Sequence, residues 1–155
     1  MSYEPSGLHP TAAKLQDRLR ERGLDVAVQM LPASARTAPE AAVAVGCEVG
    51  QIVKSLVFVR EGQPVMVLCA GDRRVAADRL GLRAASAEEA RAGTGFAIGG
   101  IPPLGHDRPL ETLIDESLRR FDTVWCAAGT PHAVFEADTD ALIAAIPGRA
   151  VADVS

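Results

Sequence analysis

A single lysine inside an apolar run is the residue of this sequence whose surroundings point most directly to chemistry. Lys54 lies in residues 52–59, where every other position except Ser55 is apolar. If this run is a strand, alternation places Lys54 on the same face as Leu56 and Phe58. Removing an ammonium from water without a partner costs several kcal/mol, so its nitrogen must reach water, a carboxylate or an anionic ligand. A lysine that snorkels to solvent, or forms an internal salt bridge, is the structural alternative.

A loop rich in glycine and proline is the second candidate. In residues 99–106, the adjacent Gly99 and Gly100 allow backbone N–H groups to approach a ligand closely, while Pro102 and Pro103 restrict the chain. Such a loop suits an oxyanion or the polar end of a small molecule. It matches neither the Walker A nor the dinucleotide-binding pattern. A purely structural turn is the alternative interpretation.

The third candidate is the corner Gly129-Thr130-Pro131-His132, where His132 either binds substrate or only completes a turn. The sequence contains no GxSxG, HExxH or Cys-His signature. Ser55 points to the face opposite Lys54, which argues against a Ser-Lys dyad. Hydrolysis by this protein would therefore have to rely on positioning and electrostatics. The three cysteines form no CxxC motif and no Cys/His cluster, so neither a metal nor a cofactor is expected.

The elements that must position these residues follow from periodicity, caps and turns. Three helices are expected with a cap: residues 12–22 after Thr11, residues 38–45 after a Thr37/Glu40 capping box, and a helix that begins at the Ser86/Glu89 capping box and ends near residue 93. A single helical turn is expected over residues 116–120. A last helix is expected from Asp138 or Thr139 to residue 146. Strands are expected over 25–31, 52–59, 65–70, 110–114, 123–128 and 133–136, the second and third forming a central hairpin. This irregular order predicts one α/β domain of the α+β type over residues 1–155, with its core at about 12–148 and a mixed central sheet of about six to seven strands flanked by short helices.

Composition restricts the function. The 155 residues include 16 basic and 20 acidic ones, a net charge of −4, which argues against general attraction to DNA or RNA. Four Phe, one Trp and one Tyr give little support for a base-stacking surface. No apolar run has the length of a membrane helix, and residues 1–5 lack the features of a signal peptide. We therefore expect a cytoplasmic protein with no membrane partner.

Three stretches together resemble the YbaK family, the aminoacyl-tRNA deacylases related to the editing domain inserted in bacterial prolyl-tRNA synthetases. They are residues 51–58, the loop 99–105 and residues 128–133, and residues 68–72 and 114–118 fit in the same order. The likeness spans about residues 15 to 146. The ordered set is more specific than any of its motifs.

The resemblance implies an enzyme that hydrolyses the ester of a mischarged tRNA in trans. The lysine matching Lys54 is central to activity in that family and is thought to contact the terminal nucleotide. Backbone amides of the loop, at Gly99 and Gly100, would face the carbonyl, and a substrate ribose hydroxyl would help to activate water. We predict that the substrate-binding residues are Ile101, Pro102, Pro103, Gly105, Gly129, Thr130 and His132.

The resemblance leaves the substrate open. Pro102 stands where the branch that removes cysteine from tRNA-Pro has a serine, so alanine, serine, threonine or another small residue is equally compatible. The expected partner is the 3′ acceptor end of a mischarged tRNA, with a synthetase as a second candidate. Arg73, Arg74 and Arg79 would meet the body of the tRNA, or simply form a solvated surface. The alternatives to the deacylase are a catalytically silent module that binds tRNA or a synthetase, and a small-molecule esterase or phosphate-ligand enzyme.

Overall fold

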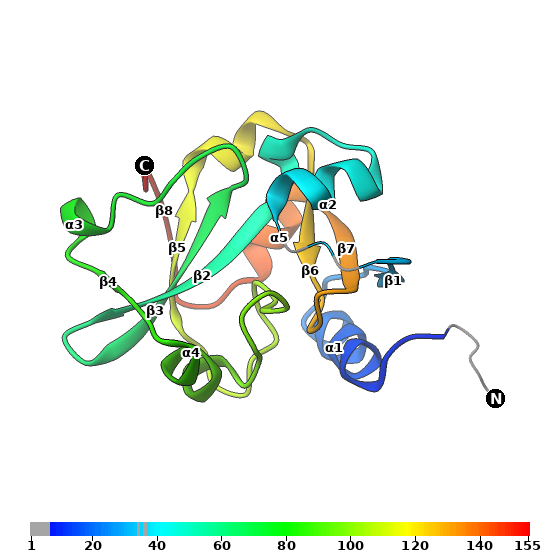
Figure 1. Ribbon diagram of the computed structural model, residues 1–155, viewed down its shortest axis with the longest axis horizontal. Helices are drawn as coiled ribbons and strands as arrows, with labels where there is room; N and C mark the ends of the chain where they lie inside the picture. The colour runs from blue at the N-terminus through cyan, green and yellow to red at the C-terminus, as the bar shows by residue number, and fades with distance from the viewer. Residues whose placement is uncertain (1–6, 34, 36) are drawn as a thin grey trace.

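The computed structural model describes residues 7–33, 35 and 37–155 of the chain. The protein is a single α+β domain, as the sequence predicts, and Figure 1 shows its strands in two groups that lie side by side. The N-terminal residues 1–5, in which no signal peptide is recognised, lie outside the described residues. No described helix has both the length and the apolar character needed to cross a membrane.

The expected single sheet is divided into two. One sheet has five strands in the order β4 (Arg83–Ala84), β2 (Val53–Arg60), β3 (Gln63–Ala70), β5 (Glu111–Asp115) and β8 (Arg149–Ala152). The other has three, in the order β1 (Gln29–Met30), β7 (Ala133–Asp138) and β6 (Thr123–Ala127). A single bridge between Ile52 and Trp125 joins the two sheets in the described part of the chain.

The hairpin β2–β3 is central in its sheet, as predicted, because β4 flanks β2 and β5 flanks β3. Its turn consists of Glu61 and Gly62, both at positive φ (51° and 78°). This is the primed two-residue turn whose twist matches that of paired strands. Pro64, which the sequence places in the turn, lies in β3 opposite Val59.

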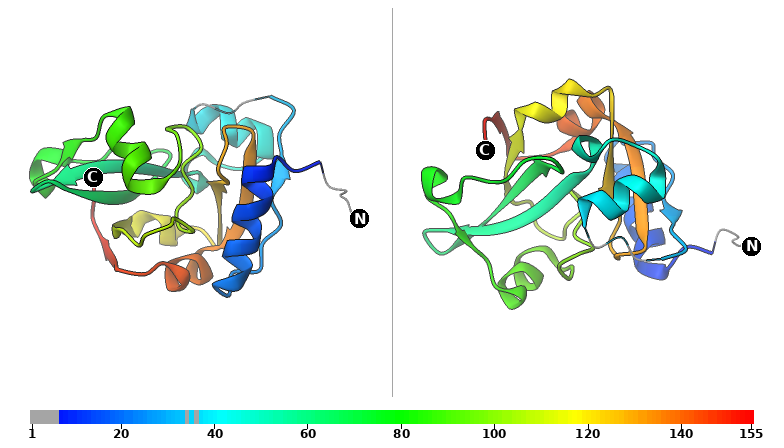
Figure 2. Two further views of the ribbon diagram at one scale, coloured as in Figure 1. Left: turned by 90° about the horizontal axis from the view of Figure 1, so that it is seen from below. Right: turned by 45° about the horizontal axis from the view of Figure 1, so that its top comes forward.

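Short helices cover the sheets (Figure 2), and local caps fix where several of them begin. Both expected capping boxes are present, in α2 (Ala38–Val45) with Thr37 and Glu40 and in α4 (Ala87–Thr94) with Ser86 and Glu89. The single-turn helix η2 (Glu116–Arg120) has the expected bounds, and α5 (Thr139–Ala145) has Asp138 as its cap.

The first helix begins earlier than its sequence pattern indicates. In α1 (Pro10–Glu21) the cap is His9, whose Nδ1 accepts a hydrogen bond from the N–H of Thr11. Thr11 is therefore inside the helix, and Pro10 occupies the first position, where a missing N–H has no cost. Leu15 and Leu19 of α1 are fully buried in the main core.

The expected strand 25–31 shrinks to the two residues of β1. The cause is side-chain capture of its backbone groups by α1. The N–H of Val28 donates to Gln16 Oε1 (2.8 Å), and Arg20 Nε donates to the carbonyl of Val26 (3.2 Å). Val26 and Val28 are still buried, so their apolar pattern reflects core packing without strand pairing.

Four short elements have no counterpart in the sequence analysis. They are η1 (Val49–Gln51), α3 (Ala77–Leu80), β4 and β8. Strand β8 lies parallel to β5 along residues 112–115, and that pairing arises from contacts distant in sequence. Periodicity alone does not reveal such elements.

Candidate active site

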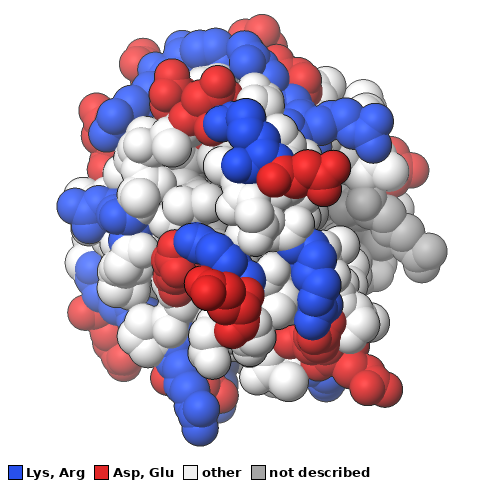
Figure 3. Space-filling model, turned by 90° about the vertical axis from the view of Figure 1, so that its left-hand side faces the viewer, with Lys and Arg blue, Asp and Glu red and all other residues white. Residues whose placement is uncertain are grey.

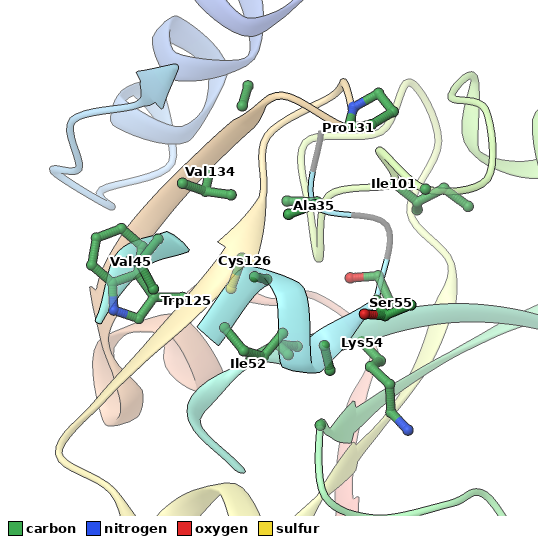
Figure 4. A pocket seen from close by; sticks show the side chains of 18 of the residues that line it. Ala35, Val45, Ile52, Lys54, Ser55, Ile101, Trp125, Cys126, Pro131 and Val134 are labelled. Carbon is green, nitrogen blue, oxygen red and sulfur yellow. The ribbon is translucent and has the colours of Figure 1, made fainter. Parts of the chain in front are cut away.

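A pocket of about 410 Å³ opens at the junction of the two sheets (Figure 4). Its walls come from α2, from β2, from β6 and β7, and from the two loops that the sequence singles out. Most of its lining is apolar, including Ala38, Val45, Ile52, Leu56, Ile98, Ile101, Trp125, Pro131 and Val134. Lys54, Ser55, Gly99 and Thr130 add polar groups. A small acyl group would fit such a space.

Lys54 reaches this pocket, and its ammonium partner is a carbonyl rather than a carboxylate. Its Nζ donates to the backbone oxygen of Arg73 at 2.5 Å. An ammonium carries three N–H donors, so two directions remain for a ligand. The internal salt bridge considered as an alternative is absent from the described residues.

The turn that holds the Arg73 carbonyl is itself anchored. The buried carboxylate of Asp115 accepts hydrogen bonds from the N–H of Ala70 (3.0 Å) and of Ser117 (2.9 Å). Arg120 binds both carboxylate oxygens of Asp72, at 2.8 and 3.0 Å, and this hydrogen bonding lowers the pKa of Asp72. These contacts fix the partner that orients Lys54.

The two adjacent glycines have different roles. Gly99 is at φ 98°, lines the pocket, and its N–H has no hydrogen-bond partner within the described chain. The N–H of Gly100 instead donates to the carbonyl of Ala97 (3.1 Å). Of the two amides predicted to face a substrate carbonyl, only that of Gly99 is therefore unpaired, because a turn already uses the Gly100 donor.

Gly100 joins the loop to the corner at Gly129. Its carbonyl accepts from the N–H of Gly129 (2.9 Å). A Cβ at Gly100 would lie 2.7 Å from Thr130 Cα, which is closer than real contacts allow. The two motifs, 29 residues apart, are therefore packed backbone to backbone, and this contact places Gly99 and Thr130 on one wall of the pocket.

The second half of the loop is buried away from the pocket. Pro102, Pro103 and Gly105 are buried and do not line it, although they are predicted to bind substrate. His106 Nε2 is 2.8 Å from the Pro102 carbonyl, and Arg18 donates to the Gly105 carbonyl (2.9 Å). Burial lowers the pKa of His106. These residues therefore support the loop and lie outside the lining of this pocket.

His132 and Gly129 also lie outside the pocket lining. His132 is exposed, and its N–H donates to Thr130 Oγ1 (3.2 Å), which is the turn role considered as the alternative. Of the predicted site residues, the pocket brings together Lys54, Gly99, Ile101 and Thr130.

Of the three arginines expected to face the tRNA (Arg73, Arg74 and Arg79), only two have side chains without a partner among the described residues. Figure 3 shows acidic and basic side chains interleaved on the face that carries α3 and the C-terminus. Arg79 donates to the carbonyls of Asp153 and Ser155, both at 2.8 Å, so it holds the C-terminal segment. Arg73 and Arg74 lie in the turn whose carbonyl, that of Arg73, accepts the hydrogen bond from Lys54. Both side chains are exposed and form no hydrogen bond or salt bridge with described residues.

Sequence reasoning missed several pocket residues. Trp125 and Cys126 belong to β6, and Val45 to α2, and no local pattern distinguishes their pocket positions from core positions. Ser55 was considered only as a dyad partner. Burial raises the pKa of the Cys69 thiol to about 11 and that of Cys126 further, so both are protonated, as expected of buried thiols. Within the described ranges, no three His, Cys, Asp or Glu side chains cluster to hold a metal.

The model of the family "Aminoacyl-tRNA editing domain" matches residues 32–145, so the chain belongs to that family.

Three individual proteins are similar to this chain. A crystal structure described as "a putative trans-editing enzyme for prolyl tRNA synthetase" is 49% identical, with a TM-score of 0.88, over 96% of this chain and 99% of that one. The uncharacterized protein YwhH of Bacillus subtilis (strain 168) is 34% identical over 66% of this chain and 70% of its own length. The proline–tRNA ligase of Lactobacillus gasseri is 33% identical over 44% of this chain, which corresponds to only 14% of that enzyme.

Proposed function

We propose that the protein is an aminoacyl-tRNA deacylase that acts in trans on tRNA-Pro, or on another tRNA, mischarged with a small amino acid. The observation that carries this proposal is the pocket whose largely apolar lining also includes Lys54, Gly99 with its free N–H, and Thr130. Membership of the editing-domain family and the likeness to the structure described as "a putative trans-editing enzyme for prolyl tRNA synthetase" support it.

The reaction needs no protein nucleophile. Water adds to the ester carbonyl, the bond to the ribose oxygen breaks, and the free amino acid and an unacylated tRNA leave. In our proposal a ribose hydroxyl of the substrate helps to orient the water. Lys54 holds the phosphate or ribose of the terminal nucleotide, and the Gly99 amide donates to the developing oxyanion. An aminoacyl ester is already activated, so orientation and one or two such donors suffice for useful rates.

The basic turn beside Lys54 would meet the tRNA. Arg73 and Arg74 are exposed next to the pocket, whereas Arg79 is occupied by the C-terminal segment. We therefore propose Arg73 and Arg74 as the contacts of the acceptor end. The overall charge of −4 restricts the attraction to this local surface.

Release of amino acid from a panel of mischarged tRNAs tests this function, with Lys54→Ala as the diagnostic variant. We expect a loss of about 100-fold or more in deacylation, because an oriented cation is removed from the reaction site. Lys14→Ala is the matched control, since Lys14 is the only other lysine and is exposed on α1. Turnover of Lys54→Ala at the rate of the unaltered protein would contradict the mechanism.

The same panel separates the deacylase from its alternatives. A silent module would bind tRNA without releasing amino acid. A small-molecule esterase would hydrolyse simple esters without tRNA.

A further inference from the structure

The edge of β2 facing the pocket is open at its centre. Strand β4 pairs with β2 only at Phe58 and Val59, and β6, although packed against β2, forms a β-bridge with this chain segment only at Ile52. Ser55 lies between these two contacts and lines the pocket. A gap in the pairing of a strand leaves backbone groups available to a ligand.

The peptide groups of Ser55 face this gap. The two-residue turn makes Arg60 and Gln63 the closing pair, so even-numbered residues of β2 exchange hydrogen bonds with β3. Odd-numbered residues then face the other edge, and the hydrogen bond from Ala85 N–H to the Val57 carbonyl (3.2 Å) agrees with this. The carbonyl of Ser55 is consequently an acceptor directed toward the gap.

The Ser55 hydroxyl is also without a partner. Its oxygen is buried and forms no hydrogen bond with the described chain. A buried hydroxyl in this state is costly, which favours a role toward a bound group. Rotation about its Cα–Cβ bond moves the oxygen between staggered positions without moving the strand. Figure 4 shows that Ser55 and Lys54 leave β2 on opposite sides.

The charges around the pocket identify the group that would bind. The described lining residues include no Asp or Glu, and Lys54, a cation among them, leaves β2 on the side opposite Ser55. An amino acid esterified to tRNA carries an α-ammonium group, which must find acceptors in any largely apolar pocket. Ser55 offers two, its hydroxyl and its carbonyl.

We propose that Ser55, at the open edge of β2, binds the α-ammonium group of the aminoacyl ester. This inference rests on the proposed function, because it takes an aminoacyl group as the ligand. Ser55 is a substrate-binding residue in this proposal and not a nucleophile. The site would reject acyl groups that lack an amine at the α-carbon.

Binding of two non-hydrolysable analogues tests the proposal. One is adenosine with alanine joined to the 3′ position by an amide, and the other is the lactyl counterpart, in which a hydroxyl replaces the amine. Calorimetric titration should show that the unaltered protein prefers the alanyl analogue. Ser55→Ala should weaken alanyl binding by about 10- to 100-fold, the usual value of a hydrogen bond to a charged group, and leave lactyl binding nearly unchanged.

Ser55→Thr keeps the hydroxyl and should retain most of the preference. Ser117→Ala is the matched control, because the Ser117 hydroxyl is likewise buried without a partner but lies outside the pocket lining. Four results would overturn the proposal that Ser55 binds the ammonium group. In the unaltered protein they are equal affinity for the alanyl and lactyl analogues, or binding of neither analogue. In Ser55→Ala they are an equal loss of affinity for both analogues, or no loss of affinity for the alanyl analogue.

Deacylation by the unaltered protein, measured in parallel, keeps the two proposals distinguishable. Release of amino acid without a Ser55-dependent preference overturns only the amine site. A Ser55-dependent preference without release overturns hydrolysis and supports a silent binding module that still recognises the amine.

Discussion

The two halves of the loop 99–106 are adjacent in sequence and have different roles. Gly99 faces the pocket with a free N–H, whereas residues 102–106 are buried, with His106 bonded to the carbonyl of Pro102. Gly100 stands between them, with its N–H used in a turn and its Cα against Thr130. We infer that a glycine in such a loop can donate its amide to a ligand only where no turn already uses that amide. The predictions below test this division.

Alanine at the two adjacent glycines should have unequal effects. Gly100→Ala places a Cβ against the Thr130 backbone, so we expect a loss of about 2–3 kcal/mol in the free energy of unfolding, together with loss of deacylation. Gly99→Ala has room and costs only the positive φ, about 1 kcal/mol. Urea unfolding of both variants measures the difference. Equal destabilisation would mean that the two loops are not packed as described.

The two histidines that the sequence places near the site should also differ. His106→Ala leaves the buried Pro102 carbonyl unpaired, and we expect a loss of about 2 kcal/mol in stability. His132→Ala changes an exposed side chain outside the pocket and should alter stability by less than about 0.5 kcal/mol. Thermal unfolding compares them. A large loss of deacylation in His132→Ala with the fold intact would restore the substrate role predicted for that residue.

The last prediction concerns the dependence of stability on pH. Burial lowers the pKa of His106, so below the ordinary histidine pKa the unfolded chain binds a proton that the folded chain does not. Stability should therefore fall as the pH decreases from about 7.5 to about 5.5, by less than about 1.4 kcal/mol per pH unit. His106→Gln should flatten this dependence. An unchanged slope in the variant would assign the effect to other groups.

Local signals made part of the fold predictable. A capping box requires only residues three apart, and the bounds of α2 follow from Thr37, Glu40 and Gly46. The primed turn at Glu61-Gly62 similarly specifies the register of the central hairpin. Contacts between distant segments account for what was missed. Gln16 and Arg20 of α1 take backbone groups that residues 25–31 would otherwise use as a strand.

Part of the lining of the candidate pocket was also predictable from the sequence. A charged residue in an apolar run identified Lys54, since the cost of burying an ammonium is independent of the fold. Gly99, Ile101 and Thr130 were identified through motifs and the resemblance. The role of Gly100, and the open position of Ser55, depend on which strands and turns take up neighbouring amides. That information exists only after the sheets are paired.

The bridge between the sheets gives this protein a built-in optical probe. Trp125 is the sole tryptophan of the chain, and it forms the bridge with Ile52 while lining the pocket. Its indole emission should therefore change when an acyl-adenosine analogue enters and drives out water. Titrations followed by intrinsic fluorescence would need no label, and the emission would come from the cavity wall itself.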